Sequence, residues 1–306
     1  MKALLVSPLV TLLLLSGCAQ SKTEEIIDHA TVVADRASVR AKNSSTSRTL
    51  QVLAAGEKVE VLERDGNWFR IRYDEQLQGW MEETTLVTSA MQARVQEMVA
   101  ASQNLQPQNT AVLSDSANFR IEPGRTTPVI RRLDQGTSVE VLDRLTILRP
   151  GTPDSAGSND TFDVWLKVRR SPVEIGWVYS GLLDFDTPPE IGPYSEGYAY
   201  PAVKVLSRVQ DSITGPVNLY VVGERKQPLD PNIDFQGIRV FTWNMGMHRY
   251  ETALRIKGLR GVYPLEVGQE EGNPAFHINE LSGDGSTKTR RHFVLIGGVV
   301  REKKVS

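Results

Sequence analysis

The sequence predicts a mainly β protein with two small β-barrels joined by a short helix, followed by a β-rich barrel or sandwich domain. Three observations predict this fold class. From Val32 onwards, short apolar segments with an alternating pattern follow one another at intervals typical of small β-barrels. One set of residues occurs twice along the chain. After Leu183, short apolar segments separated by turn residues continue to the end.

The composition of the chain limits the classes of function. The chain has 306 residues, of which 40% are hydrophobic and 24% are charged, so we expect two or three domains. A net charge of −2 indicates no nucleic-acid partner, because such proteins carry a basic surface. The single cysteine, Cys18, excludes an intramolecular disulfide and a metal site built on two cysteines.

The N-terminus has the pattern of a signal peptide over residues 1–17. Lys2 precedes an apolar segment from Ala3 to Leu15, which is shorter than the roughly 20 residues that a membrane-spanning helix needs. Small residues at Ser16 and Gly17 then lead directly to Cys18. This pattern favours a cleaved signal over a membrane-spanning helix.

The segment Leu15-Ser16-Gly17-Cys18 resembles the lipobox of bacterial lipoproteins. The resemblance implies cleavage before Cys18 and lipidation of that residue, which would anchor the chain to a membrane by acyl groups. The alternative is a plain secretory peptide with an incidental cysteine. Ala19 is similar to the residue that follows the cysteine in outer-membrane lipoproteins, and residues 18–31 are expected to form a tether.

An internal repeat defines two domains, at residues 32–88 and 110–186. The segments 68–72 (Trp-Phe-Arg-Ile-Arg) and 79–81 (Gly-Trp-Met) recur 97 positions later, at 165–169 and 176–178. The segments 37–40 and 53–62 recur 80 positions later, at 117–120 and 133–142. The change in offset predicts an inserted loop in the second copy, at 145–161, where the composition is rich in Gly, Pro, Ser and Asp.

These recurring residues resemble those of bacterial SH3 domains: a small residue followed by Val-Arg, a Gly before Val-x-Val, Trp-x-x-Ile/Val and a final Gly-Trp. The resemblance implies two SH3-like barrels. It also implies a targeting or adaptor role in the cell envelope, often toward peptidoglycan peptides. The ligand residues of that family vary, so only the fold and the broad role are carried over.

A helical linker is predicted between the two barrels, at residues 89–109. Ser89 and Gln92 have the spacing of a capping box at the start of a helix. Met91, Val95 and Met98 recur at helical spacing, and this apolar face either packs against a barrel or binds a partner.

A Pro-rich linker at 187–201 precedes the third domain, at 202–306. Asp284-Gly285 predicts a two-residue hairpin, which would place His277 opposite His292. Such a pair can hold a metal or act as a pH-sensitive contact, or it can be an ordinary cross-strand pair on a solvated face. A metal site would need a third ligand that the spacing does not supply.

No catalytic motif is present in the sequence. The chain lacks Gly-x-Ser-x-Gly, Ser-x-x-Lys, His-Glu-x-x-His and a phosphate-binding glycine loop. Cysteine peptidases that accompany such barrels need a thiol beside a histidine, and the only thiol lies in the predicted signal region. We therefore expect no enzyme activity, no cofactor and no metal site.

Strand parity predicts the ligand-binding side chains. Successive side chains of a strand point to opposite faces, so Trp68, Arg70 and Arg72 share one face. In the second copy the corresponding residues are Trp165, Lys167 and Arg169. A tryptophan beside two cations suits anionic peptides, or else forms a solvated cation layer that only keeps a small barrel soluble.

The function predicted from these features is that of a non-catalytic, lipid-anchored envelope protein. It would bind peptidoglycan or its peptides and face the periplasm, with the outer membrane favoured over the inner one. The alternative is an envelope scaffold or assembly lipoprotein whose barrels bind protein partners. No part of the sequence identifies the role of the third domain.

Overall fold

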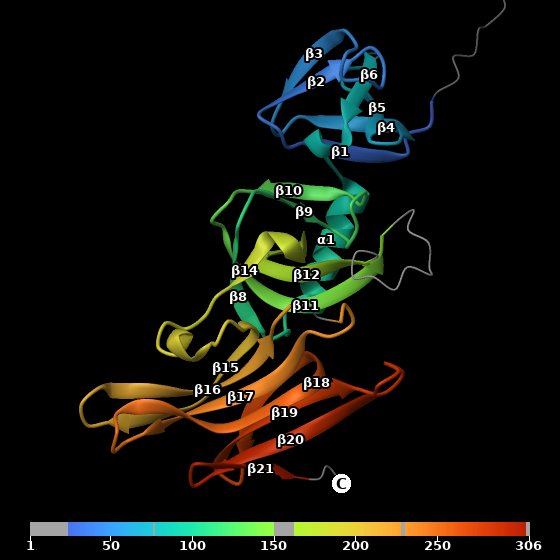
Figure 1. The fold of residues 1–306 in the computed structure, drawn as a ribbon. Coiled ribbons are helices and arrows are strands. Elements are labelled where there is room, and N and C mark those ends of the chain that lie inside the picture. Colours follow the sequence, from blue (N-terminus) through green and yellow to red (C-terminus); the bar gives the residue numbers. More distant parts are fainter. Residues whose placement is uncertain (1–23, 76, 150–161, 228–229, 304–306) are drawn as a thin grey trace, which may run out of the picture.

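The computed structural model describes residues 24–75, 77–149, 162–227 and 230–303. In these ranges the chain forms three seven-stranded antiparallel sheets and one α-helix, and the sheets follow one another along the molecule (Figure 1). The predicted mainly β fold is confirmed. The predicted signal peptide, the lipidation site Cys18 and most of the inserted loop lie outside the described residues. None of the described helices is long and apolar enough to span a bilayer.

Domain 1 (residues 28–88) shows the alternation that the sequence predicts. In β5, Phe69 and Ile71 are buried, whereas Trp68, Arg70 and Arg72 are partly exposed. The strands pair in the order β3-β2-β6-β5-β4-β1-β7. They are β1 (Asp28–Val32), β2 (Arg36–Arg40), β3 (Thr49–Ala54), β4 (Lys58–Asp65), β5 (Trp68–Arg72), β6 (Gln78–Glu82) and β7 (Leu86–Thr88), with a 3-10 turn at Glu83–Thr85.

Domain 2 (residues 109–185) has the same strand order with every label raised by seven, β10-β9-β13-β12-β11-β8-β14. Arg40 lies opposite Trp80 in domain 1, and Arg120 lies opposite Trp177 in domain 2. Residues that are related by the offsets of 80 and 97 therefore occupy equivalent positions in the two domains. The strands are β8 (Asn109–Leu113), β9 (Ala117–Arg120), β10 (Val129–Leu133), β11 (Ser138–Leu148), β12 (Phe162–Ser171), β13 (Glu174–Tyr179) and β14 (Leu183–Phe185), with a 3-10 turn at Ser180–Leu182.

The hairpin β11–β12 is longer than its counterpart β4–β5 in domain 1. Strand β11 continues to Leu148, so residues 145–148 of the predicted loop are strand, and residues 150–161 lie outside the described ranges. The pairing of β11 with β12 extends to Leu148 opposite Phe162. This extension gives domain 2 contacts that domain 1 lacks.

Helix α1 (Ser89–Ser102) starts beneath domain 1, where it contacts β1 and β7, and runs behind domain 2, where it contacts β13 (Figure 1). Its N-cap is Thr88, not the predicted Ser89. Thr88 keeps an extended backbone and its hydroxyl accepts a hydrogen bond from the Met91 amide at 3.1 Å, while Ser89 donates its own hydroxyl to His29 O. Met91 is buried and packs at the start of the helix, whereas Val95 and Met98 of the same face are half-buried.

Domain 3 is a single antiparallel meander in which each strand pairs only with its neighbours in sequence. The two edge strands, β15 and β21, do not pair with each other, so the expected barrel or sandwich is instead one open, bent sheet. A short 3-10 turn, Gly192–Tyr194, precedes it. The strands are β15 (Ala199–Asp211), β16 (Gly215–Arg225), β17 (Phe235–Asn244), β18 (Arg249–Glu270), β19 (Asn273–Leu281), β20 (Lys288–Ile296) and β21 (Val299–Lys303).

The predicted register of the hairpin β19–β20 is confirmed, because His277 lies opposite His292. The turn itself is wider than predicted. Its last hydrogen bond runs from the Ser282 amide to Thr287 O at 2.8 Å, which leaves four residues in the turn. The Asp284 carboxylate accepts hydrogen bonds from the Ser282 hydroxyl and from the amide and hydroxyl of Ser286. These bonds favour the wider turn and lower the pKa of Asp284 to about 2.

Domains 2 and 3 share one hydrophobic core, whereas domain 1 has its own. The buried side-chain carbonyl of Gln108 accepts a hydrogen bond from the Leu265 amide at 2.8 Å, and the backbone carbonyl of Gln108 accepts one from the Val203 amide at 2.8 Å. Arg144, on the extended hairpin, forms a buried ion pair with Asp234 at 3.3 Å. Burial raises the pKa of Asp234 to about 6 despite this neighbour.

Gly79 and Gly176 occupy equivalent positions where the backbone approaches a neighbouring strand. A Cβ at Gly176 would lie 2.7 Å from the Phe119 ring and 2.9 Å from Arg120 O, and a Cβ at Gly79 would lie 2.4 Å from Val39 and 2.9 Å from Arg40 O. We expect Gly176→Ala and Gly79→Ala each to lower the free energy of unfolding by about 1–3 kcal/mol, measured by denaturant titration. Gly283→Ala, which meets no atom within 4 Å, is the control. Equal stability of all three variants would contradict this expectation.

Candidate functional site

In domain 1 the predicted cations are bound by the protein's own carboxylates. Arg70 pairs with Glu24 of the tether at 2.8 Å and with Glu63 at 2.9 Å, and Arg72 pairs with Glu60 at 2.8 Å. The hydrogen bond from Arg70 lowers the pKa of Glu24. The aromatic-basic face predicted for domain 1 is thus already occupied by acidic side chains.

Arg169 of domain 2 holds the end of helix α1. It pairs with Glu140 at 2.6 Å and donates to Leu105 O at 3.1 Å. The equivalent pair in domain 1 is Arg72 with Glu60. In each pair the two residues lie directly opposite each other on neighbouring strands. The Arg169 guanidinium therefore binds groups of the protein itself, and Arg169 does not line the same cavity as Trp165.

Trp165 and Lys167 lie on the face that strand parity predicts, but they are differently exposed. The Lys167 ammonium lies 5.1 Å from the centre of the Trp177 ring, a cation–π arrangement. The sequence predicts a solvent-exposed Trp165, but this side chain is only 3% exposed, so that prediction is wrong. Tyr179, directly opposite on β13, packs its ring edge against Trp165 with the ring centres 5.9 Å apart.

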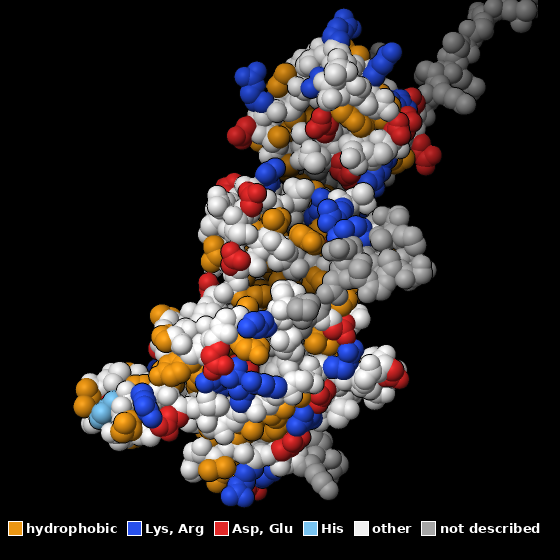
Figure 2. All heavy atoms as spheres, viewed as in Figure 1, with side chains coloured by type: hydrophobic (Ala, Val, Ile, Leu, Met, Phe, Trp, Pro, Cys, Tyr) orange, Lys and Arg blue, Asp and Glu red, His pale blue; other side chains and the backbone are white. Residues whose placement is uncertain are grey.

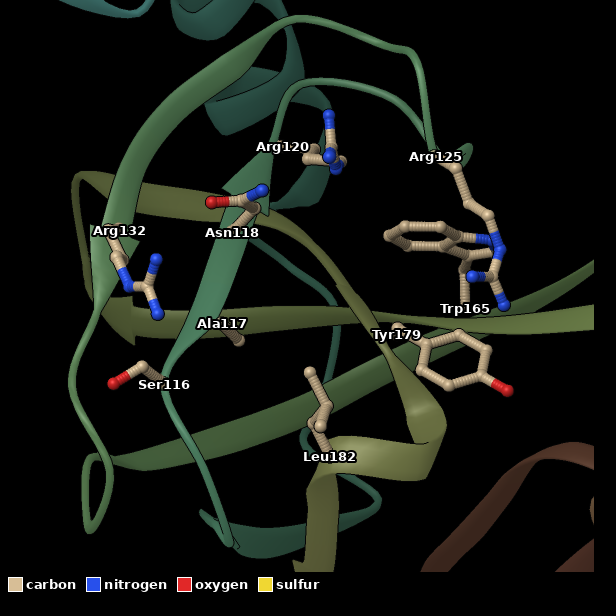
Figure 3. A pocket seen from close by; sticks show the side chains of 9 residues that line it. All are labelled: Ser116, Ala117, Asn118, Arg120, Arg125, Arg132, Trp165, Tyr179 and Leu182. Carbon is tan, nitrogen blue, oxygen red and sulfur yellow. The ribbon is translucent and has the colours of Figure 1, made fainter.

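A cavity of about 360 Å³ opens beside Trp165 in domain 2 (Figure 3). It extends over four adjacent strands, β10, β9, β13 and β12. The space-filling view shows basic side chains gathered on domain 2 beneath domain 1 (Figure 2). The residues that line the cavity are Ser116, Ala117, Asn118, Arg120, Arg125, Arg132, Trp165, Tyr179 and Leu182.

The cavity lining is basic and contains no carboxylate side chain. Arg120 donates to the backbone carbonyl of Thr127, and burial lowers its pKa because no acidic group offsets the loss of water. Arg132 is exposed, and none of the described residues binds its guanidinium. Both cations can therefore gain from an anionic ligand.

Arg125 is held in place from outside the cavity. It binds the fully buried carboxylate of Asp163 through two hydrogen bonds of 2.7 and 3.0 Å, and its guanidinium lies 5.4 Å from the centre of the Tyr179 ring. A bidentate pair of this kind fixes the direction of a guanidinium. The extended hairpin supplies Asp163, so the insertion helps to build the cavity.

Domain 1 lacks the same cavity lining. By the offsets of 80 and 97, Arg132 corresponds to Val52, and Tyr179 corresponds to Glu82. Glu82 lies opposite Trp68, as Tyr179 lies opposite Trp165. One cation is replaced by a hydrocarbon and one ring by a carboxylate, so this face of domain 1 is much less suited to an anion.

Sequence reasoning identified Trp165 but missed four cavity residues: Arg120, Arg125, Arg132 and Tyr179. In the sequence, Arg120 is the second residue of the repeated Val-Arg or Phe-Arg pair. Tyr179 stands two residues after the tryptophan of the repeated Gly-Trp pair. A search of the two copies for equivalent positions with different residue types would have found Arg132 and Tyr179. Arg125 carries no such signal, because its place depends on Asp163 across the sheet.

The histidine pair of domain 3 belongs to a polar row on one face. His292 hydrogen-bonds both His277 and Glu270, and Glu270 in turn binds Lys303. Burial, the largest influence, lowers the pKa of His277, and the nearby charge of Arg290 acts in the same direction. In the described part of the chain, no three His, Cys, Asp or Glu side chains are placed to hold a metal.

Comparison with known proteins identifies one part of the chain. Residues 35–87 match the family model of the bacterial SH3 domain. No curated protein matches the chain. Among solved structures, NlpC2 from Trichomonas vaginalis is similar at 14% identity and a TM-score of 0.18, over 55% of this chain and 53% of its own length. NlpC1 from the same organism is similar at 11% identity and a TM-score of 0.19, over 90% and 94% of the two chains.

The matched residues include strands β2 to β6 of domain 1, with Val39-Arg40 and Gly79-Trp80 among them. The chain therefore contains a bacterial SH3 domain at residues 35–87, as part of a mainly β protein.

Proposed function

We propose that this protein binds anionic peptide segments in the cavity of domain 2, without catalysing a reaction on them. The observation that carries the proposal is the cavity lining of three guanidinium groups and two aromatic rings with no acidic side chain. Guanidinium groups form the strongest hydrogen bonds with carboxylates, and aromatic rings supply apolar contact for peptide side chains.

The partner proposed is peptidoglycan or its stem peptides, which carry carboxylates. A bacterial SH3 domain at residues 35–87 supports a role related to the cell wall. The proposal further includes lipidation of Cys18, which would hold the protein in the envelope with its domains in the periplasm, at the outer membrane in preference to the inner one. The tether from residue 18 onwards would let the domains reach the wall.

Sedimentation of the full chain with insoluble peptidoglycan tests this function. We expect the wild-type protein to sediment with the polymer, and the double variant Arg132→Val/Tyr179→Glu to bind at least about tenfold more weakly. Both new residues stand at the equivalent positions of domain 1, so the fold accepts them there. Arg131→Ala is the matched control, because its side chain pairs with Glu174 outside the cavity.

Wild-type protein that stays in the supernatant, or equal binding by the double variant, would overturn the proposal. Chemical crosslinking in intact membranes separates the alternative function. A wall-binding protein should stay with detergent-washed peptidoglycan, whereas a scaffold lipoprotein should leave with defined envelope proteins.

A further inference from the structure

Two hydrogen-bond donors among the residues that line the cavity of domain 2 have no acceptor. The indole N–H of Trp165 is buried and has no hydrogen-bond partner. Arg132, which lies on β10 opposite Asn118 of β9, has no partner among the described residues. The Arg132 guanidinium is exposed as well as unpaired, so a ligand that brings an acceptor gains binding free energy from it.

The chemistry of these donors selects between two similar ligands. A carboxylate offers only acceptors and carries a negative charge, whereas a carboxamide replaces one oxygen by an NH₂ group that donates. Facing Arg120 and Arg132, which lie on the neighbouring strands β9 and β10, that NH₂ group would meet donors and no free carboxylate of the protein. The amide would thus lose both a charge-assisted hydrogen bond and the charge itself.

The size and position of the cavity fit the end of a chain. Its volume of about 360 Å³ lies at the lower limit of small-ligand sites, so it holds a terminal residue or one acidic side chain. The two rings of Trp165 and Tyr179, packed edge to face, form an apolar wall next to the guanidinium groups. The Asp163 carboxylate lies behind Arg125 and is fully buried, so it fixes that cation without lining the cavity.

We infer that the domain 2 cavity recognises a free carboxylate of a peptide and rejects the corresponding amide. This inference rests on the proposed function and specifies its ligand class. A cell-wall peptide with a free acid would bind, and the same peptide after amidation of that acid would not. Domain 1, with Val52 and Glu82 at the equivalent positions, would not discriminate between them.

Isothermal titration calorimetry of the full chain with three synthetic peptides tests this inference. The peptides are Ala-Glu-Lys-Ala as the free acid, its C-terminal amide, and the Ala-Gln-Lys-Ala acid. Each of the last two peptides lacks one carboxylate of the parent acid. We expect one of them to bind about tenfold to hundredfold more weakly than the parent, and the peptide that does so shows which carboxylate the cavity binds. Arg132→Val should reduce binding of the parent acid to the same weak level, and Arg131→Ala should not.

Equal affinity for all three peptides, or no binding of any of them, would overturn the inference. Its failure is distinguishable from failure of the proposed function. Sedimentation with peptidoglycan that persists while acid and amide bind equally leaves the function intact and removes only the carboxylate selectivity. Loss of sedimentation removes the function itself.

Discussion

Asp234→Ala is expected to lower the free energy of unfolding of the domain 2–domain 3 unit by about 3–5 kcal/mol. The variant leaves the guanidinium of Arg144 buried without its carboxylate, since the two side chains are only 8% and 5% exposed. It also removes the acceptor of the Tyr263 amide, which Asp234 binds at 2.7 Å. Denaturant titration followed by tryptophan fluorescence measures the loss.

Two controls separate a buried ion pair from a general effect of truncation. Asp230→Ala removes a carboxylate that pairs with Arg260 near the same interface but is 30% exposed, and it should cost no more than about 1 kcal/mol. The double variant Arg144→Leu/Asp234→Leu should recover part of the lost stability, because it removes the unpaired guanidinium of Arg144 but leaves the Tyr263 amide without its acceptor. Similar losses for Asp234→Ala and Asp230→Ala would contradict this account of the interface.

Gly261→Ala is expected to destabilise domain 3 by roughly 3 kcal/mol, the upper part of the range for overpacked cores. A Cβ at this position would lie 2.0 Å from Cε2 of the Phe235 ring, and that ring is completely buried. The contact lies where β18 passes the start of β17, since the Asp234 amide donates to Gly261 O at 2.8 Å. The measurement is again the denaturant midpoint and slope.

The control for Gly261 lies on the same strand. Gly268→Ala meets no atom within 4 Å, so it should change stability by no more than about 0.5 kcal/mol. Combining Gly261→Ala with Phe235→Leu should cost less than the sum of the two single changes, because the smaller side chain removes the overlap. Strict additivity of the two variants would show that the ring is not the obstacle.

Local patterns in the sequence predicted much of the fold. Parity in the segment 68–72 correctly placed Phe69 and Ile71 inside and the cations outside, because a strand alternates its faces. Two conserved offsets located equivalent positions, such as Arg40 and Arg120. A turn signal also gave the pairing of His277 with His292. Parity and the turn signal depend on residues close together in sequence, and the offsets depend on a comparison of the two copies.

The cavity could not be predicted in the same way, because distant residues build it. The exposure of Trp165 depends on the ring of Tyr179 and on Arg125, which is fixed by Asp163 of the extended hairpin. Whether the Arg70 guanidinium is free to bind a ligand depends on Glu24, 46 positions earlier in the chain, because Glu24 accepts a hydrogen bond from it. Parity tells on which face a side chain lies, but the other groups on that face decide whether its charge is free.

The location of the peptide site is tested most directly by an NMR titration of the five tryptophan indole N–H signals, with the Ala-Glu-Lys-Ala acid added to the full chain. Three of the tryptophans serve as reporters within the two related domains: Trp165 lines the cavity, Trp177 lies beside it, and Trp68 occupies the equivalent place in domain 1. We predict a large shift of the Trp165 signal, a smaller one for Trp177 and none for Trp68. A shift of the Trp68 signal with an unchanged Trp165 signal would contradict the assignment of the site to domain 2.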